Sequence, residues 1–314
     1  MRCPLCGGES VTVIAETLRD GEGRVFHCAD CDLGFLDPAA QPRDPAAYYA
    51  GTYRREHGTA PGRAAAPEEI FATFAPEQEG RVGLLRPHLT PRTRLLEVGC
   101  ATGHFLAAVK PFCGEVTGLD YNPEHTAFAA ARTGCRVLTG GPAEADLPPA
   151  AFDVVCAFQT LEHVPEPLGF LAALSRLLTP GGLIAIEVPN LGDPLLSVYR
   201  APRYRSFFYH RAHALYFTPR SLSLVMERAG FAGTVSFRQD YNLANHLHWA
   251  FLDAPQPHAK LGLGPARLPG LRDDLAPEVR ADLDAWAADA DRTYRAVLAR
   301  HGLTDNLTFL GRKP

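Results

Sequence analysis

The chain has 314 residues, of which 46% are hydrophobic and 21% charged, and its formal net charge is -4. This composition is typical of a soluble globular protein with one main domain and a small appendage. The absence of a basic block argues against a nucleic-acid substrate. We find neither a leader-like start nor an apolar run of membrane-spanning length, so we expect a cytoplasmic protein without a membrane partner.

The N-terminal segment carries two Cys-x-x-Cys pairs, formed by Cys3 with Cys6 and by Cys28 with Cys31. Four thiolates at this spacing close a tetrahedron around a structural zinc ion. A redox dithiol needs only one pair, and a disulfide is disfavoured in a reducing compartment. We therefore expect a zinc ribbon over residues 1–38, and its few basic residues favour packing on the rest of the chain.

Residues 39–78 are rich in proline, alanine and glycine, which is typical of a linker. Tyr48, Tyr49 and Tyr53 are unusual in a plain spacer. They either fix the linker to the body of the protein or help to close a lid over a ligand.

From residue 94 onward, short apolar runs alternate with amphipathic segments, as in a parallel α/β sheet. We expect strands at 94–98, 114–120, 135–138, 152–158, 181–189, 233–239 and 306–314. The last strand is expected to be antiparallel, which gives an α/β, Rossmann-like seven-stranded sheet. The core then spans residues 79–238, followed by a helical insertion at 239–305 that caps the substrate and by the final strand at 306–314.

The first strand of this core ends in the turn "EVGCATG". Gly99 and Gly103 let the backbone pass close to a ligand, and Asp120 at the end of the next strand can accept hydrogen bonds from ribose hydroxyls. The carboxylate of Glu97 would repel a pyrophosphate but suits an ammonium group. The turn therefore favours a cofactor that combines an amino acid with a ribose over a dinucleotide.

Four motifs of the chain, taken together and in their order, resemble those of class I S-adenosylmethionine-dependent methyltransferases. They are "LLEVGCATGHFL", "VTGLDYNPE", "FDVVCAFQTLEHVPEP" and "LLTPGGLIAIEVPN". The resemblance covers residues 80–238. It implies binding of S-adenosylmethionine, with S-adenosylhomocysteine as product, and a role in natural product biosynthesis.

The resemblance also implies which residues hold the cofactor. The methionine part would lie against the turn residues Glu97, Gly99, Cys100 and Gly103. Asp120 would bind the ribose, Tyr121 would flank the adenine, and Gln159 would lie near the methionine end. The loop after the third strand lacks the polar residue usual in the family, so Ala143 would contact the adenine through its backbone.

Two histidine-rich segments, after the fifth and the sixth strand, start from the carboxyl edge of the sheet and should overhang the transfer site. The first contains His210 and His213, and the second contains His246. His163, after the fourth strand, is a further candidate base. A single histidine is more often structural, but the clustering with aromatic and polar residues favours an acceptor pocket.

The layout of ribbon and core is similar to that of bacterial small-molecule methyltransferases, among them sugar C-methyltransferases. In the latter a Tyr-x-Glu-His cluster carries base catalysis. Here His213 takes the position of the base, while Ala212 replaces the acid and His210 the tyrosine. The resemblance thus implies base-assisted methyl transfer to a small molecule, a secondary metabolite or a nucleotide-linked sugar, at carbon, oxygen or nitrogen.

A long amphipathic helix is expected within residues 276–302, with a stripe formed by Val279, Leu283, Trp286, Ala290 and Val297. We interpret the stripe as a packing surface, and the protein is expected to be a monomer or a homodimer. Two rival functions stay open: an RNA methyltransferase that grips its substrate with the ribbon, and a non-catalytic methyltransferase-like partner subunit. The net charge of -4 counts against the first and the intact cofactor motif against the second.

Overall fold

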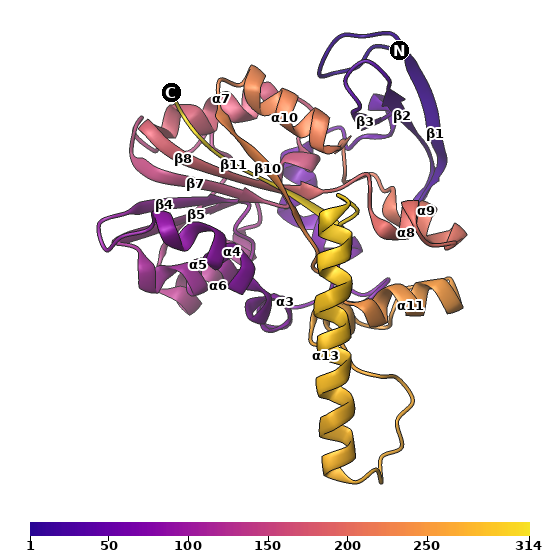
Figure 1. Ribbon diagram of the computed structural model, residues 1–314. Helices are drawn as coiled ribbons and strands as arrows, with labels where there is room; N and C mark the ends of the chain where they lie inside the picture. Colours follow the sequence, from indigo (N-terminus) through magenta and orange to yellow (C-terminus); the bar gives the residue numbers. More distant parts are fainter.

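The computed structural model describes residues 1–314 and contains one large and one small sheet (Figure 1). The large sheet has the strand order β10-β11-β8-β7-β4-β5-β6. Its strands are β4 (Arg94–Val98), β5 (Glu115–Asp120), β6 (Arg136–Thr139), β7 (Phe152–Phe158), β8 (Leu178–Pro189), β10 (Ala232–Arg238) and β11 (Asn306–Arg312). All pairs are parallel except those of β11, which runs antiparallel to β8 and β10. The expected α/β, Rossmann-like seven-stranded sheet is confirmed.

Helices cover both faces of this sheet, because its central strands are apolar on both sides. One face carries α7 (Pro167–Leu177) and α10 (Pro219–Arg228), and the other α4 (Glu79–Leu85), α5 (His104–Val109) and α6 (Pro123–Thr133) (Figure 1). The buried residues of α7 recur at helical spacing, as do those of α5. None of the helices combines the length and the apolar character that crossing a membrane requires.

The ribbon forms a small sheet of its own, β1 (Val11–Leu18), β2 (Gly21–Cys28) and β3 (Gly34–Leu36). A fourth strand, β9 (Leu215–Tyr216), joins it from the segment after β8, with Phe35 opposite Leu215. Leu5, Phe26 and other ribbon residues belong to the same hydrophobic cluster as the buried residues of α7 and α10. The ribbon is therefore built into the body of the protein.

The segment between β8 and β9 contains α8 (Pro194–Ser197) and α9 (Pro202–Phe208). Tyr204 and Phe208 of α9 pack in one cluster with Val25 and Leu36 of the ribbon and with Trp249. This segment therefore lies between the ribbon and the insertion, at the carboxyl edge of the sheet.

Residues 39–78, where a linker or lid was expected, form short helices. These are α1 (Pro45–Ala47), a π-helical turn (Tyr48–Thr52), α2 (Tyr53–Glu56) and α3 (Pro67–Phe74). Asp44 accepts a hydrogen bond from the backbone of Ala47 and so caps α1.

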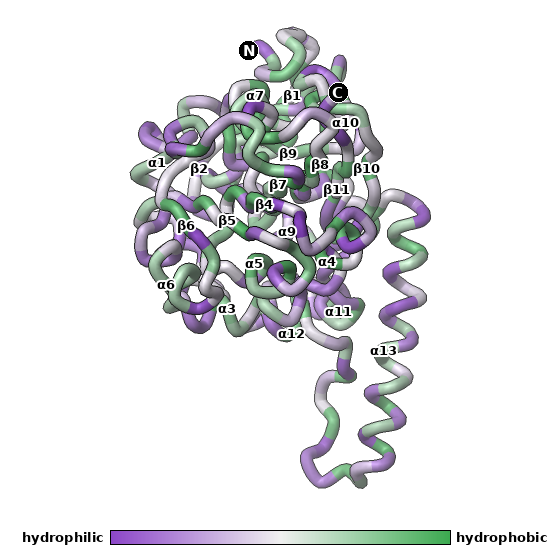
Figure 2. The backbone as a smooth tube through the Cα atoms, turned by 90° about the vertical axis from the view of Figure 1, so that its left-hand side faces the viewer, coloured by the Kyte–Doolittle hydropathy of each residue, from purple (hydrophilic) through white to green (hydrophobic).

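The insertion before β11 contains α11 (Leu243–Leu252), α12 (Ala259–Leu263) and α13 (Pro277–Arg300). In both views, α13 and the loop leading into it project from the body (Figures 1 and 2). The expected stripe does not pack on the rest of the chain: Val279, Trp286 and Val297 are 44%, 59% and 43% exposed. The buried residues of α13 are Ala287, Asp291 and Leu298, on a different face.

Candidate functional site

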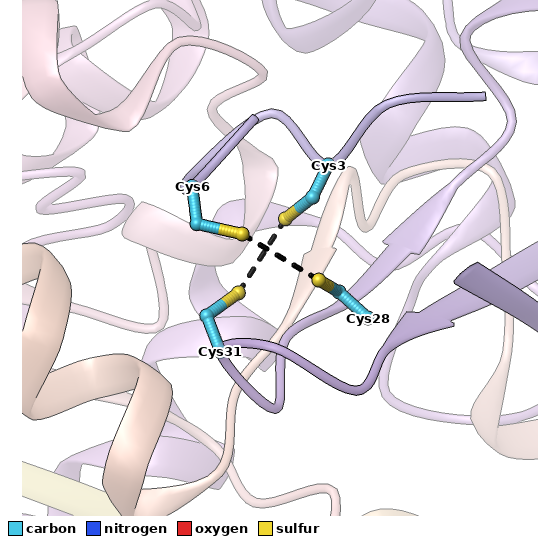
Figure 3. Close-up of side chains that lie close together, drawn as sticks. All are labelled: Cys3, Cys6, Cys28 and Cys31. Atoms are coloured by element: carbon cyan, nitrogen blue, oxygen red, sulfur yellow. Dashed lines mark hydrogen bonds between the residues drawn. The ribbon is translucent and has the colours of Figure 1, made fainter. Parts of the chain in front are cut away.

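The four ribbon cysteines converge on one point (Figure 3). The Sγ atoms of Cys3 and Cys31 lie 3.5 Å apart, as do those of Cys6 and Cys28. All four are free thiols and lie within 4.8 Å of one another. Zinc–sulfur bonds of about 2.3 Å in a tetrahedron place the sulfur atoms about 3.8 Å apart. The arrangement could therefore hold a zinc ion after a small expansion.

The glycine turn after β4 borders a cavity of about 220 Å³ at the carboxyl edge of the sheet. Gly99 lines this cavity with a φ of +80°, and a side chain at this position would collide with the hydroxyl of Thr160. Gly103 has a φ of +78° but packs against Ala129 of α6 and does not line the cavity. The first glycine keeps space for a ligand, whereas the second lets two helices approach.

Asp120 lines the cavity at the end of β5 and is held in place by two backbone groups. Its carboxylate accepts hydrogen bonds from the N–H groups of Ala101 at 2.8 Å and of Asn122 at 2.9 Å. Burial raises the pKa of this carboxyl group, against the lowering effect of these backbone bonds. A carboxylate fixed in this way can accept hydrogen bonds from vicinal hydroxyl groups.

The other expected cofactor residues are distributed around this cavity. Tyr121 and Gln159 line it, but Cys100 and Ala143 do not. Glu97 does not line it either and lies buried in β4 with Oε2 unpartnered. Burial raises the pKa of Glu97 to about 8, against the lowering effect of Arg81.

The short helices of residues 45–56 cover this cavity. Pro45, Tyr49, Tyr53 and Arg54 all line it. The hydroxyl of Tyr49 donates to the carbonyl of Ala212 at 2.7 Å and lies 3.0 Å from Nδ1 of His163, which ties the segment to the histidine segment after β8. Tyr49 and Tyr53 therefore line the cavity, whereas Tyr48 does not and bonds to Glu56 of the same segment.

A second cavity of about 510 Å³ lies between the ribbon, the segment after β8 and the insertion. Its walls include the aromatic side chains of Tyr204, Phe207, Phe208, Tyr241 and Trp249. The volume is that of a site for a small organic ligand, typically about 300–1,000 Å³. Gln159 lines both cavities, so they meet at this residue.

Gln159 itself is strained. It is one of the few non-glycine residues with positive φ, at +52°. Its side-chain amide donates to Glu187 at 3.2 Å and to Asn306 at 2.8 Å. Residues held in this backbone region by surrounding bonds are frequent at functional sites.

A cluster of titratable groups lies at the boundary of the two cavities. His163 lines the first cavity, and His210 and His213 line the second. Glu162 is buried, and its Oε1 lies 3.7 Å from Nε2 of His163 and 3.9 Å from Nε2 of His213. The rings of His210 and His213 are 3.8 Å apart. The structure therefore brings together three of the four expected histidines.

Several polar atoms of this cluster have no hydrogen-bond partner, although they are buried. They are both carboxylate oxygens of Glu162 and the Nδ1 atoms of His210 and His213. His163 differs, because its Nδ1 contacts the carbonyl of Ala212 at 2.8 Å, which favours a proton on Nδ1. Unpaired buried groups of this kind are costly and are typical of a site that receives its partner from a ligand. The three side chains Glu162, His163 and His213 could also hold a metal ion.

Burial shifts the titration of this cluster toward neutral forms. It raises the pKa of Glu162 to about 8 and lowers that of His163 to about 4. Burial also places the pKa of His213 well below its ordinary value, assisted by His163 and Arg19. The histidines are therefore neutral near pH 7 and able to accept a proton.

His246 lines the second cavity but lies apart from the cluster. Its Nδ1 is hydrogen-bonded to the hydroxyl of Tyr294 in α13, and its Nε2 lies 3.5 Å from the amide of Gln239. Both ring nitrogens are thus engaged with neighbouring side chains.

Comparison with known proteins identifies the central part of the chain. A family model described as a methyltransferase domain matches residues 63–235. The chain belongs to this methyltransferase family. The expected resemblance to class I S-adenosylmethionine-dependent methyltransferases is thereby confirmed for the domain that contains the glycine turn and the first cavity.

Among curated relatives, a Mycolicibacterium smegmatis protein named "Probable S-adenosylmethionine-dependent methyltransferase" is 35% identical over 97 residues, 31% of this chain and 38% of its own length. A ubiquinone biosynthesis O-methyltransferase of Xanthomonas campestris is 33% identical over 107 residues, 32% of this chain and 44% of its own length. The chain thus spans about two fifths of these relatives. A solved S-adenosylmethionine-dependent methyltransferase of Archaeoglobus fulgidus has 18% identity and a TM-score of 0.47, and the match covers 75% of this chain and 94% of that one.

Some residues of the two cavities and of the histidine cluster were not identified from the sequence. Glu162 directly precedes His163 in the turn after β7, and an acid in the loop that follows an apolar strand is a signal that could have identified it. Arg54 and Arg19 reach the two cavities from the cover and from the ribbon. Neither arginine has a local sequence signal, because only the tertiary fold brings these segments to the sheet edge.

Proposed function

We propose that the protein is an S-adenosylmethionine-dependent methyltransferase that acts on a small molecule by base-assisted methyl transfer. The observation that carries this proposal is the meeting of the two cavities at Gln159, with the Glu162–histidine cluster at the boundary. The first cavity would hold the cofactor and the second the acceptor.

The residues of the first cavity fit the cofactor. Asp120 has a fixed carboxylate for the ribose, and Gly99 leaves space beside Thr160. Glu97 is buried behind the turn with Oε2 unpartnered, and this oxygen would be available to the ammonium group of the cofactor. When bound, S-adenosylmethionine supplies an activated methyl group and leaves as S-adenosylhomocysteine. The protein has to orient the acceptor atom and remove one proton from it.

His213 is the proposed base. Its Nδ1 is buried without a partner, whereas its Nε2 faces the carboxylate of Glu162 at 3.9 Å. A proton on Nε2 leaves the lone pair of Nδ1 free to accept the proton of the acceptor. Glu162 would then stabilise the imidazolium, as an acid stabilises histidine in catalytic triads. His163 and His210 assist from either side.

We also propose that Cys3, Cys6, Cys28 and Cys31 hold a structural zinc ion. The convergence of the four free thiols supports this, as does the hydrogen bond from the N–H of Gly8 to Cys6 Sγ at 3.4 Å. A site closed by four thiolates leaves no open position for chemistry. The zinc ion would therefore stabilise the ribbon.

The size and lining of the second cavity support a secondary metabolite or a nucleotide-linked sugar as the acceptor. Ala212 and His210 replace the acid and the tyrosine of the sugar C-methyltransferases, so that particular chemistry is not carried over. The names of the relatives favour oxygen as the acceptor atom.

The experiment begins with mass spectrometry of ligands that copurify with the protein. A thermal-shift screen of nucleotide sugars and other metabolites follows, on protein saturated with S-adenosylhomocysteine. Hits are then tested for methyl transfer. Absence of any binding of S-adenosylmethionine or S-adenosylhomocysteine would refute the proposal.

The role of the base is tested by His213→Ala. We expect unchanged affinity for S-adenosylhomocysteine and a turnover at least ~10²-fold lower. The control is His88→Ala, which replaces an exposed histidine outside both cavities. Near-normal turnover of the His213 variant would reject His213 as the base.

A further inference from the structure

The second cavity contains a side chain from the ribbon. Arg19 lies in the turn between β1 and β2, and this turn reaches across to the segment after β8. The N–H of Arg19 donates to the carbonyl of Tyr209 at 2.7 Å, and the N–H of Arg211 donates to Asp20 at 3.2 Å. These bonds fix the tip of the hairpin in the wall of the cavity.

The guanidinium of Arg19 is held in a defined plane. Its Cζ lies 3.7 Å from the ring centroid of Phe207, and its Nε donates to the carbonyl of the same residue at 2.6 Å. Neither Nη atom has a hydrogen-bond partner. A stacked guanidinium with both Nη groups free presents the planar pair of donors that matches a carboxylate or a phosphate.

Burial weakens the negative charge of two acids in the cavity wall, because it raises the pKa of Asp193 to about 7 and that of Asp305 well above its ordinary value. Both side chains are also held by neutral donors. Asp193 accepts bonds from the N–H of Leu195 at 2.7 Å and the hydroxyl of Tyr204 at 3.0 Å. Asp305 accepts bonds from the side chain of Gln239 at 2.9 Å and the N–H of Tyr241 at 2.8 Å.

The remaining charged groups of the wall are one acid, Glu56, and the two arginines Arg19 and Arg203. Glu56 is bonded to the hydroxyl of Tyr48 at 2.8 Å. Arg203 is a second lining arginine, and its guanidinium, like that of Arg19, forms no ion pair. Two arginines without an ion pair therefore stand against one remaining acid, Glu56, in the wall of the cavity.

We infer that the second cavity takes an acceptor with an anionic group, a phosphate or a carboxylate, and that the guanidinium of Arg19 binds this group. That this ligand is the methyl acceptor rests on the proposed function, whereas the binding of an anion by Arg19 does not. The aromatic walls would cover the uncharged part of the molecule, and the histidine cluster would face the atom to be methylated. The ribbon then contributes to substrate specificity as well as to the fold.

The test is isothermal titration calorimetry at low salt on the zinc-loaded full chain, with and without S-adenosylhomocysteine. Pyrophosphate and malonate are the two probes, and the one that binds identifies the group as phosphate or carboxylate. We expect Arg19→Gln to weaken binding by about 10-fold to 100-fold, as for the loss of hydrogen bonds to a charged group. Arg19→Lys, which keeps the charge but loses the planar pair of donors, should lie between Arg19→Gln and the unmodified protein.

The matched control is Arg2→Gln, which makes the same change of net charge at an exposed ribbon residue outside the cavity. It should bind both probes as the unmodified protein does. The inference is overturned if neither probe binds at millimolar concentration, if Arg19→Gln binds unchanged, or if Arg2→Gln loses as much affinity. Salt-sensitive binding of an RNA oligonucleotide that depends on Arg19 would also overturn it.

Different results would refute the proposed methyltransferase function and the proposed anion site. Without binding of S-adenosylhomocysteine the proposed function falls, yet the anion titration of the zinc-loaded protein can still be read. Methyl transfer to an uncharged acceptor with equal KM in the unmodified protein and Arg19→Gln would overturn the anion site and leave the methyltransferase activity standing.

Discussion

Replacement of Glu162 by glutamine tests the proposed proton transfer most directly. Glutamine keeps the shape of the side chain but cannot stabilise a charged imidazole. The carboxylate oxygen lies 3.9 Å from Nε2 of His213 in a buried setting. With an effective dielectric constant of about 20, the interaction of two unit charges at this distance is about 4 kcal/mol. Full loss of this term would slow the step that charges His213 by about 10³-fold.

The effect should depend on pH, because burial raises the pKa of Glu162 to about 8. Above this pH the carboxylate is ionised and the variant should lose about 10² to 10³ in kcat. At pH 6.5 most molecules of the unmodified protein already carry a neutral Glu162, so the loss should shrink to roughly tenfold. The kcat of the unmodified protein should rise with pH toward a plateau above 8, whereas the variant should lack this rise.

Thermal stability provides the readout that separates catalysis from folding. The folded pKa of Glu162 is raised from its ordinary 4.5 to about 8, so folded molecules bind more protons in this interval. The free energy of unfolding therefore falls as pH rises from 4.5 to 8. The glutamine variant lacks the part of this fall that Glu162 causes. The Tm of the variant minus that of the unmodified protein should therefore increase as the pH is raised from 4.5 to 8.

The assay measures kcat and KM between pH 6 and 9.5 with radiolabelled S-adenosylmethionine, together with the affinity for S-adenosylhomocysteine. Glu166→Gln is the matched control, since Glu166 is an exposed acid in the same loop. A kcat profile of Glu162→Gln that coincides with that of the unmodified protein would refute the role of Glu162. So would a loss confined to cofactor affinity.

Three further outcomes are expected. Gly99→Ala should weaken binding of S-adenosylhomocysteine at least tenfold in calorimetry, because the new methyl group meets Thr160 and a positive φ costs about 1 kcal/mol; unchanged affinity would contradict the placement of the cofactor. Tyr49→Phe removes the bond to the carbonyl of Ala212, worth about 0.5–1.5 kcal/mol, and the contact with Nδ1 of His163, and should raise the KM for S-adenosylmethionine about threefold to tenfold. Cys6→Ser should release zinc into a chromogenic chelator and lower Tm; full retention of both zinc and Tm would argue against the four-thiolate site.

The sequence predicted the parts of the fold that depend on local patterns. The strands of the large sheet are short apolar runs between turn residues, and each was expected within a few residues of its observed position. The turn at Gly99 was identified because two glycines directly follow an apolar strand and an acid closes the next one, and Gly99 indeed has a φ of +80°. These features are encoded within a few neighbouring residues.

The parts that depend on tertiary pairing were not predictable. Strand β9 has only two residues, and its pairing with β3 joins positions about 180 apart. The buried face of α13 is set by polar anchors rather than by its apolar stripe: Asp291 accepts the N–H of Leu243, and Tyr294 contacts Tyr199. Hydrophobic periodicity alone therefore did not indicate the face of α13 that packs within the chain.

The small sheet physically connects the cysteine cluster to the proposed base. Gly34 pairs with Tyr216, and the N–H of Leu36 donates to the carbonyl of Ala214 at 2.9 Å, one residue after His213. The strand that completes the ribbon thus also sets the backbone of the histidine segment. Because a zinc ion would stabilise the ribbon strands, its loss should disturb both the anion site at Arg19 and the position of His213. Loss of zinc is therefore expected to lower kcat and raise acceptor KM together, whereas Arg19→Gln should change KM alone.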